Sequence, residues 1–269
     1  MPTDKRQRQK QGRAARQAAL EAHRRRAARR RQIVSLVAIV AVVFVVVALI
    51  SRGGSDKSTV TATNRTTTTT GVPPTTLAPA KGDANTCPAA DGSSPRATQF
   101  TAAPKMCIDP AKKYTAAMQT DLGTITISLD AAKAPKTVNN FVFLARYHFY
   151  DTSLFHRVIP GFVVQGGDAN KGDGTGDAGY KIPDELPKQG DYKVGSVAMA
   201  NSSAANSGGS QFFIIVGTQG LSLPPAYSLF GMVTDGIDVA HKIEQDGAMT
   251  SDGKPKVLHQ IIKVTITEA

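Results

Sequence analysis

Residues 33–50 are eighteen consecutive positions of which only Ser35 carries a polar side chain. At about 1.5 Å rise per residue, a helix of this length spans about 27 Å, close to the hydrocarbon thickness of a bilayer. The run therefore predicts a single transmembrane helix. It also divides the chain into a short segment before the span and a long one after it.

Positive charge is concentrated before this span. Residues 1–31 hold 12 Lys and Arg and 2 acidic residues, so this stretch carries +10 of the +11 of the whole chain. Positive charge marks the cytoplasmic side of a membrane helix, which places a basic tail, residues 1–32, in the cytoplasm. We expect a single-pass protein of the cell membrane with everything after the span outside the cytoplasm.

Three other interpretations of this end of the chain are weaker. A cleaved secretory signal usually has an apolar segment of about 7–15 residues followed by a small-x-small site, and no clear A-x-A follows here. A buried helix of a soluble core does not explain the flanking arginines. Nucleic-acid binding by the tail is not expected, because topology and contact with anionic lipid account for its charge.

The next two segments are predicted to lack regular structure. Residues 51–85 are rich in Ser, Thr, Pro and Gly without apolar periodicity, so we expect a disordered linker. An irregular lead-in, residues 86–111, contains the two cysteines, Cys87 and Cys107. Outside the cytoplasm a disulfide is the expected state, and closing such a loop stabilises a fold by about 3 kcal/mol.

Residues 112–269 have the pattern of one globular domain. A hairpin is predicted from residues 114–120 and 124–129, joined at Asp121-Leu122-Gly123. Pro135 opens a helix to about Arg146, since proline suits a first helical turn. The remaining predicted elements are short strands near residues 155–159, 162–165, 194–200, 211–216, 229–233 and 260–267, and a helix at about residues 236–245.

Many short strands with only two helices indicate a mainly β domain. We expect a closed antiparallel β-barrel with the helices at its ends.

Motifs for metal, phosphate or nucleophilic chemistry are missing from the sequence. The five histidines form no HExxH pair, and there is no G-x-S-x-G elbow or P-loop lysine. The glycine-rich run 166–179 matches neither an EF-hand nor a dinucleotide loop, so we interpret it as a tight structural loop. We expect no metal and no cofactor.

Two remaining segments could form a pocket, namely FHRVIPGFVVQGGD (residues 155–168) and VAMAN followed by SGGSQFFI (residues 197–214). Strand alternation is expected to place Phe155 and Arg157 on one face, with Phe162, Val163 and Gln165 returning beside the arginine after the Pro160-Gly161 turn. An arginine bordered by apolar groups and an amide is typical of a small binding pocket. The alternative is an ordinary barrel core with the arginine extended over it.

These segments resemble the two signature segments of the cyclophilin family of peptidyl-prolyl isomerases, and YSLFG (residues 227–231) resembles a third. The resemblance covers roughly residues 112–267. It implies an eight-stranded antiparallel barrel capped by two helices, acting on X-Pro bonds of polypeptides without a cofactor. The order of tail, span, linker and domain is similar to that of membrane-bound bacterial cyclophilins.

Site residues follow from the resemblance position by position. Arg157 matches the catalytic arginine, and Gln165 matches a glutamine that binds the substrate backbone. Phe162, Val163 and Phe213 match the proline pocket, and Ala200, Asn201 and Gln211 match the groove for the preceding residues.

Two positions depart from the family pattern. Tyr227 stands where well-known members have histidine, and the segment 220–225 contains no tryptophan where cyclosporin-sensitive members carry one. Leu223 is expected to close the pocket instead. The resemblance therefore implies retained catalysis with weak cyclosporin binding.

The resemblance implies a monomeric isomerase domain that assists the folding of proline-containing polypeptides outside the cytoplasm. Two alternatives remain. The domain could act as an anchored binding module or chaperone with incidental turnover, or the basic tail could carry the function as a cytoplasmic contact.

Overall fold

The computed structural model describes residues 80–250 and 252–269 of the chain. The basic tail, the apolar span and nearly all of the predicted linker lie outside these residues. None of the helices within the described residues is long and apolar enough to cross a membrane.

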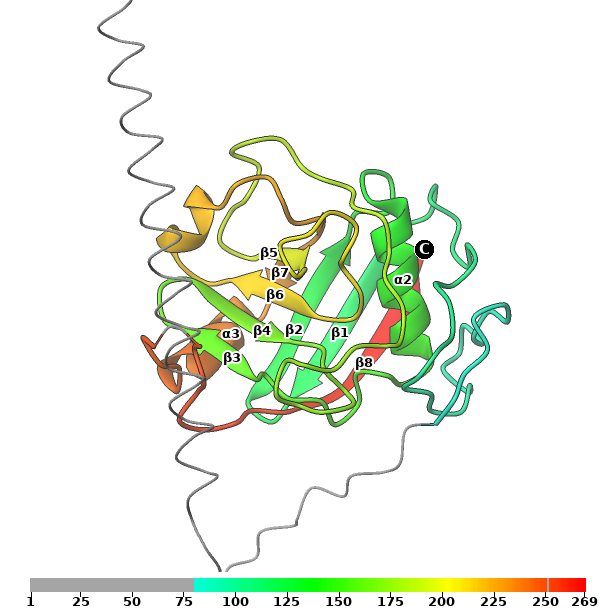
Figure 1. Cartoon of the computed structure of the whole chain (residues 1–269), viewed down its shortest axis with the longest axis horizontal. Helices are drawn as coiled ribbons and strands as arrows, with labels where there is room; N and C mark the ends of the chain where they lie inside the picture. Colours follow the sequence, from blue (N-terminus) through cyan, green and yellow to red (C-terminus); the bar gives the residue numbers. More distant parts are fainter. Residues whose placement is uncertain (1–79, 251) are drawn as a thin grey trace, which may run out of the picture. The chain divides into compact units, whose positions relative to one another are not determined.

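The described region is mainly β, with helices at its sides (Figure 1). Both predicted helices form, and the first begins at Pro135 and ends at Arg146 as expected. One short 3-10 helix was not predicted. The strands are β1 Tyr114–Thr120, β2 Gly123–Leu129, β3 Arg157–Ile159, β4 Val163–Gly166, β5 Ser196–Met199, β6 Phe212–Ile215, β7 Leu229–Asp235 and β8 Ile261–Glu268; the helices are α2 Pro135–Arg146, η1 Thr218–Ser222 and α3 Ile237–Gln245.

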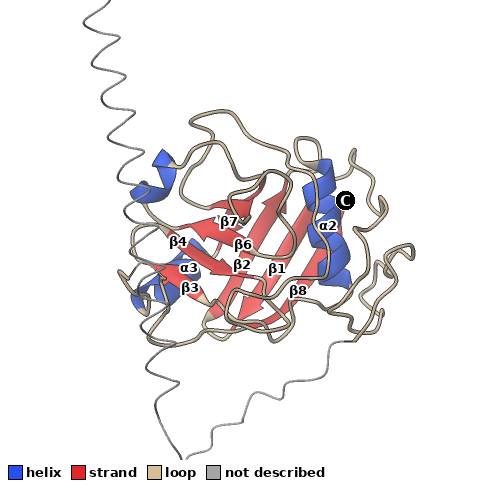
Figure 2. Ribbon diagram, in the orientation of Figure 1, coloured by secondary structure: helices blue, strands red, loops and turns tan. Residues whose placement is uncertain are grey.

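All eight strands join one sheet in the order β3-β4-β6-β5-β7-β2-β1-β8, and each neighbouring pair is antiparallel. Figure 2 shows the strands of this sheet in red. The predicted closed barrel is wrong, because the two end strands, β3 and β8, do not pair with each other. The sheet curls into a half-barrel instead.

A seam separates β3 from β8. Isolated hydrogen bonds made by the residues just before β3 cross this seam. Leu154 makes isolated bridges to Asp168 and to Gln260. The Phe155 N–H donates to the His259 carbonyl at 3.0 Å, and the Ile261 N–H donates to the Ser153 carbonyl at 2.8 Å. β3 is only three residues long, so a continuous ladder cannot form there.

The strands carry apolar side chains on both faces of the sheet. On the inner face they pack with α2 and the segment after it into the main core, which includes Phe141, Tyr150, Phe212 and Phe230, all fully buried. Helix α2 packs over this core beside β8, and α3 packs near β3 and β4 (Figure 1). A glutamate distant in sequence, Glu185, accepts hydrogen bonds from backbone N–H groups in the first turn of α2, where negative charge is favourable.

The lead-in packs against the domain although it forms no helix or named strand. Phe100 is 2% exposed and lies among the rings of Phe143, Tyr147 and Tyr180. Contacts begin inside the range expected to be linker, where Lys81 pairs with Gln99.

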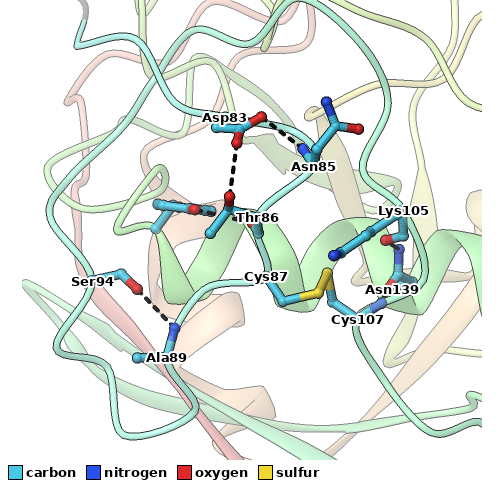
Figure 3. Close-up of a disulfide and its surroundings, with 10 residues drawn as sticks. Asp83, Asn85, Thr86, Cys87, Ala89, Ser94, Lys105, Cys107 and Asn139 are labelled. Atoms are coloured by element: carbon cyan, nitrogen blue, oxygen red, sulfur yellow. Dashed lines mark hydrogen bonds between the residues drawn. A yellow bond between two sulfur atoms is a disulfide. The ribbon is translucent and has the colours of Figure 1, made fainter.

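A disulfide joins Cys87 to Cys107 in this segment (Figure 3). Asn139 of α2 fixes the second cysteine, because its side-chain oxygen accepts the Cys107 N–H at 2.7 Å and its amide donates to the Lys105 carbonyl at 2.9 Å. The disulfide and this amide together attach the lead-in to the helix.

Candidate active site

Strand register brings the predicted residues into one row across the outer face of the sheet. Arg157 of β3 lies opposite Gln165 of β4, and Gln165 lies opposite Phe213 of β6. Phe213 in turn faces Ala198 of β5. Because directly paired residues share a face, the arginine, the amide and the aromatic ring stand side by side.

Apolar side chains beside this row form a second, smaller cluster, here called the outer pocket. Its buried members include Val163 and Phe213, and its partly buried members include Phe162, Leu223 and Tyr227. The five predicted pocket residues, drawn from β4, β6 and two loops, therefore lie together. The cluster is completed by Tyr192, Ala198, Ala200, Ile215 and Leu229.

A tight turn sets Phe162 beside the arginine. The Phe162 N–H donates to the Ile159 carbonyl at 3.1 Å, and Gly161 between them has φ +75°, a conformation that glycine adopts without strain. The Arg157 guanidinium carbon lies 5.9 Å from the centre of the Phe162 ring, within the range of a cation–π contact.

Arg157 belongs to a chain of polar side chains. Its Nη1 donates to Gln165 Oε1 at 3.3 Å, and Gln165 Nε2 donates to Gln211 Oε1 at 3.1 Å. Burial is the largest influence on the pKa of the guanidinium and lowers it from the ordinary value, while Tyr227 acts in the opposite direction. Arginine remains protonated under such conditions, so a positive charge stands at the edge of the outer pocket.

A polar groove continues from the outer pocket. It encloses a cavity of about 250 Å³, lined by the three predicted groove residues Ala200, Asn201 and Gln211, by Gln165 and by the glycine-rich loop. A larger cavity, about 1310 Å³, lies elsewhere and is lined by none of the predicted residues.

The side chain of Asn201 is engaged within its own loop and with the loop before β7. Its Nδ2 donates to the Ala226 carbonyl at 2.8 Å, and its Oδ1 accepts the Ser203 N–H at 3.0 Å. It therefore shapes the end of the groove in this structure.

Tyr227 contacts the pocket through its ring, which lies 5.3 Å from that of Phe213 in an edge-on arrangement. Its backbone is held by Tyr192, a residue that sequence reasoning missed. The Tyr192 hydroxyl donates to the Tyr227 carbonyl at 2.7 Å and accepts its N–H at 3.1 Å. Tyr192 lies in an irregular segment, so no periodicity indicated its role.

Phe155 is not on the face of Arg157, contrary to expectation. The strand begins only at Arg157, so alternation does not extend back to Phe155, which is fully buried in the main core. His156 is also buried, and this burial lowers its pKa.

Among residues 80–250 and 252–269, no group of three His, Cys, Asp or Glu side chains could hold a metal ion. The arrangement offers a cationic donor, amides and an apolar recess. Chemically, it can bind an uncharged ring and direct hydrogen bonds at the atoms next to it.

The region that contains this site is similar in sequence to known proteins. The profile of the family described as cyclophilin type peptidyl-prolyl cis-trans isomerase/CLD matches residues 115–266. The peptidyl-prolyl cis-trans isomerase cypE of Dictyostelium discoideum is 38% identical over 156 residues, covering 57% of this chain and 97% of the relative. A peptidyl-prolyl cis-trans isomerase of Synechococcus elongatus is 44% identical over 120 residues, covering 45% of this chain and 80% of the relative.

Solved structures agree with this assignment. A cyclophilin type isomerase of Cryptosporidium parvum, crystallised in the presence of the dipeptide Ala-Pro, is similar with a TM-score of 0.51 and 30% identity. The similarity covers 57% of this chain and 98% of that structure. Because the matched residues 115–266 are more than half of the 269 in the chain, it belongs to the family of cyclophilin-type peptidyl-prolyl cis-trans isomerases.

Proposed function

We propose that Arg157 catalyses the isomerisation of X-Pro bonds bound across the outer pocket and the polar groove. The proline ring occupies the recess formed by Phe162, Val163 and Phe213, with Leu223 and Tyr227 at its rim. The observation that carries this assignment is the cross-strand row in which Arg157, Gln165 and Phe213 stand side by side.

The chemistry requires no covalent step. Rotation about a peptide bond has a barrier of about 18–20 kcal/mol because resonance gives the C–N bond double-bond character. In the twisted state the proline nitrogen becomes pyramidal and gains a lone pair. A guanidinium directed at this nitrogen stabilises the twisted state more than either planar isomer, and this difference in stabilisation accelerates the exchange.

Each neighbour of Arg157 has a separate task in this scheme. Apolar walls hold the proline ring and exclude water, which strengthens the field of the arginine. Gln165, Ala200, Asn201 and Gln211 line the groove in which the residues before proline lie, so that one side of the bond stays fixed while the other rotates. An arginine at the pocket edge also disfavours a pure binding module, because binding an apolar ring does not need it.

Turnover of a proline peptide by the full chain in detergent micelles tests this role. Replacing Arg157 by Ala should lower kcat/KM by about a hundredfold or more, the scale of losing one preorganised donor. R157K, which keeps the charge and loses the planar fork, should recover only part of the rate. Normal turnover by folded R157A would contradict the catalytic role of Arg157. No turnover by the wild-type chain, with the protein folded and binding peptide, would leave the anchored binding module as the better description.

We further propose that the isomerase acts outside the cytoplasm, anchored by residues 33–50, and assists folding of exported chains that contain proline. The apolar run, the basic residues before it and the disulfide, which suits an oxidising compartment, support this placement. Protease added to spheroplasts that express the chain should digest the isomerase domain while cytoplasmic marker proteins survive. Protection of the domain until the membrane is lysed would contradict the proposed topology.

A further inference from the structure

A buried carboxylate lies at the end of β4, two residues after the strand ends. Asp168 is 1% exposed, and its two oxygens accept four backbone N–H groups from the glycine-rich loop. Oδ1 accepts Asn170 N–H at 3.2 Å and Lys171 N–H at 2.9 Å, and Oδ2 accepts Gly174 and Gly176 N–H, both at 2.9 Å. The loop is therefore wrapped around one side chain.

The charge of Asp168 is maintained by these bonds. Burial alone raises the pKa of its carboxyl, but the backbone N–H groups outweigh burial and hold the pKa below the ordinary value. A side chain at Gly176 would collide with the carboxylate, which shows how closely the loop encloses it.

The same two glycines hold a residue of the groove. Gly174 and Gly176 direct their carbonyls at Gln211, whose Nε2 donates to both at 2.8 Å. Two residues whose N–H groups are held by Asp168 thus hold the amide of Gln211 through their carbonyls. Gln211 in turn accepts from Gln165, which accepts from Arg157.

This series of hydrogen bonds can run in only one direction. Carbonyls accept only, so the end of Gln211 that faces them must be its NH2 group. A guanidinium donates only, so the end of Gln165 that faces Arg157 must be its oxygen. Both glutamines are then oriented without ambiguity, although an isolated amide can be turned end for end.

We propose that Asp168 is a positioning residue for Arg157, acting through the glycine-rich loop, Gln211 and Gln165. The role rests on the proposed catalytic function of Arg157. Asp168 itself touches neither the outer pocket nor the substrate groove. Its loss frees the Gln211 amide, and the guanidinium then samples orientations that do not face the proline nitrogen.

The test replaces Asp168 by Asn in the full chain in detergent micelles. An Asn side chain presents one oxygen and one NH2 group, so one pair of loop N–H groups loses its acceptor. Asp173→Asn is the matched control, because Asp173 lies in the same loop and accepts the Thr175 N–H and hydroxyl, yet is exposed and is not among the hydrogen-bond partners of Gln211.

We expect D168N to lower kcat/KM about tenfold or more, the scale of a small misplacement of a catalytic group, with affinity for a short Ala-Pro peptide changed less than about threefold. D173N should stay within about twofold of the wild type. The side-chain NMR signals of Arg157 should broaden or shift in D168N alone, a change that a loss of global stability does not produce in a protein that is still folded.

A double-mutant cycle separates this role from general weakening of the domain. In an R157A background the D168N substitution should have little further effect on the rate, because the arginine that Asp168 positions is absent. If D168N lowers the rate in the R157A background by the same factor as in the wild type, the proposal is overturned. Wild-type turnover by folded D168N would overturn it as well. If D168N does not fold, D168E serves instead, because it keeps the charge and displaces the carboxylate, and wild-type turnover by D168E also overturns the proposal.

The outcomes for the two proposals differ. Normal turnover by R157A contradicts the catalytic role of Arg157. A large loss in R157A combined with normal turnover in D168N contradicts only the positioning role of Asp168.

Discussion

Phe212 and Phe213 are neighbours on β6 and point to opposite faces of the sheet. Phe212 lies in the main core, with ring centres 5.6 Å from those of Phe141 and Tyr150. Phe213 lies in the outer pocket, where its neighbours Phe162, Leu223 and Tyr227 are only partly buried. One face is filled and covered, whereas the other keeps apolar surface that is incompletely covered. The same strands thus supply stability on one face and a binding recess on the other.

Truncation in the main core should have the largest effect on stability. Replacing Phe212 by Ala removes a fully buried ring and should lower the free energy of unfolding by about 3–5 kcal/mol. Chemical denaturation measures this change. A loss below about 1 kcal/mol would show that the inner face is not the filled core described here.

Removing the disulfide should weaken the fold without reaching the outer pocket. Replacing both Cys87 and Cys107 by Ser removes a bridge across a sequence separation of 20 residues and should cost about 3 kcal/mol of unfolding free energy. Turnover at a temperature where the variant is folded should stay within about twofold. A large loss of kcat/KM would mean that the lead-in controls the site and would break the division between the two faces.

Truncation in the outer pocket should show the opposite balance. Phe162 is half-buried, so Phe162→Ala should cost only about 1 kcal/mol of stability. It should nevertheless lower kcat/KM about tenfold, because the ring forms a wall of the recess and faces the Arg157 guanidinium. Steady-state kinetics beside a denaturation curve gives both values. A stability loss equal to that of F212A would show that the outer face contributes as much to stability as the inner face.

The smallest predicted effect is a pH dependence of stability that comes from a histidine near the seam. His259 is 6% exposed and contacts Asp121 at 2.8 Å and Asp246 at 3.0 Å. Burial alone lowers its pKa, but the two carboxylates outweigh burial and raise it. A raised pKa stabilises the fold below the unfolded value of about 6.5, and this contribution is lost as pH rises through the folded pKa.

Thermal unfolding followed from about pH 5 to pH 8 should therefore show a decline in the wild type that H259Q lacks. Turnover should be similar in both proteins at each pH, because the His259 side chain bonds to Asp121 and Asp246 and is part of neither the outer pocket nor the polar groove. The same pH dependence of stability in the two proteins would show that His259 does not cause the decline.

Local signals account for the elements that the sequence predicted well. The β1–β2 hairpin and α2 depend on alternation, a glycine turn and Pro135, all of which act within a few residues. The site residues on β4 and β6 follow from the same alternation once the register is known. Their roles came from the family resemblance and stay predictions until the variants above are measured.

Long-range contacts account for what the sequence did not reveal. The start of β3 and the open seam depend on bonds between segments about a hundred residues apart, such as Phe155 to His259. Tyr192 and Asp168 lie in the irregular stretch between β4 and β5, where no apolar periodicity indicates which residues they contact. The glycine-rich run was interpreted as a structural loop, and its link to Gln211 is visible only in three dimensions.

The seam between β3 and β8 has a consequence for self-association. An unpaired strand edge is a template on which another copy of the chain can add a strand and begin an aggregate. Here Val158 of β3 bonds to Gly253 and Ala248. Ile261 at the start of β8 bonds to Ser153, and His259 just before it bonds to Phe155. Irregular segments thus occupy the hydrogen-bonding positions of Val158 in β3 and of Ile261 at the start of β8, so these positions of the two end strands are not open to a strand from another copy.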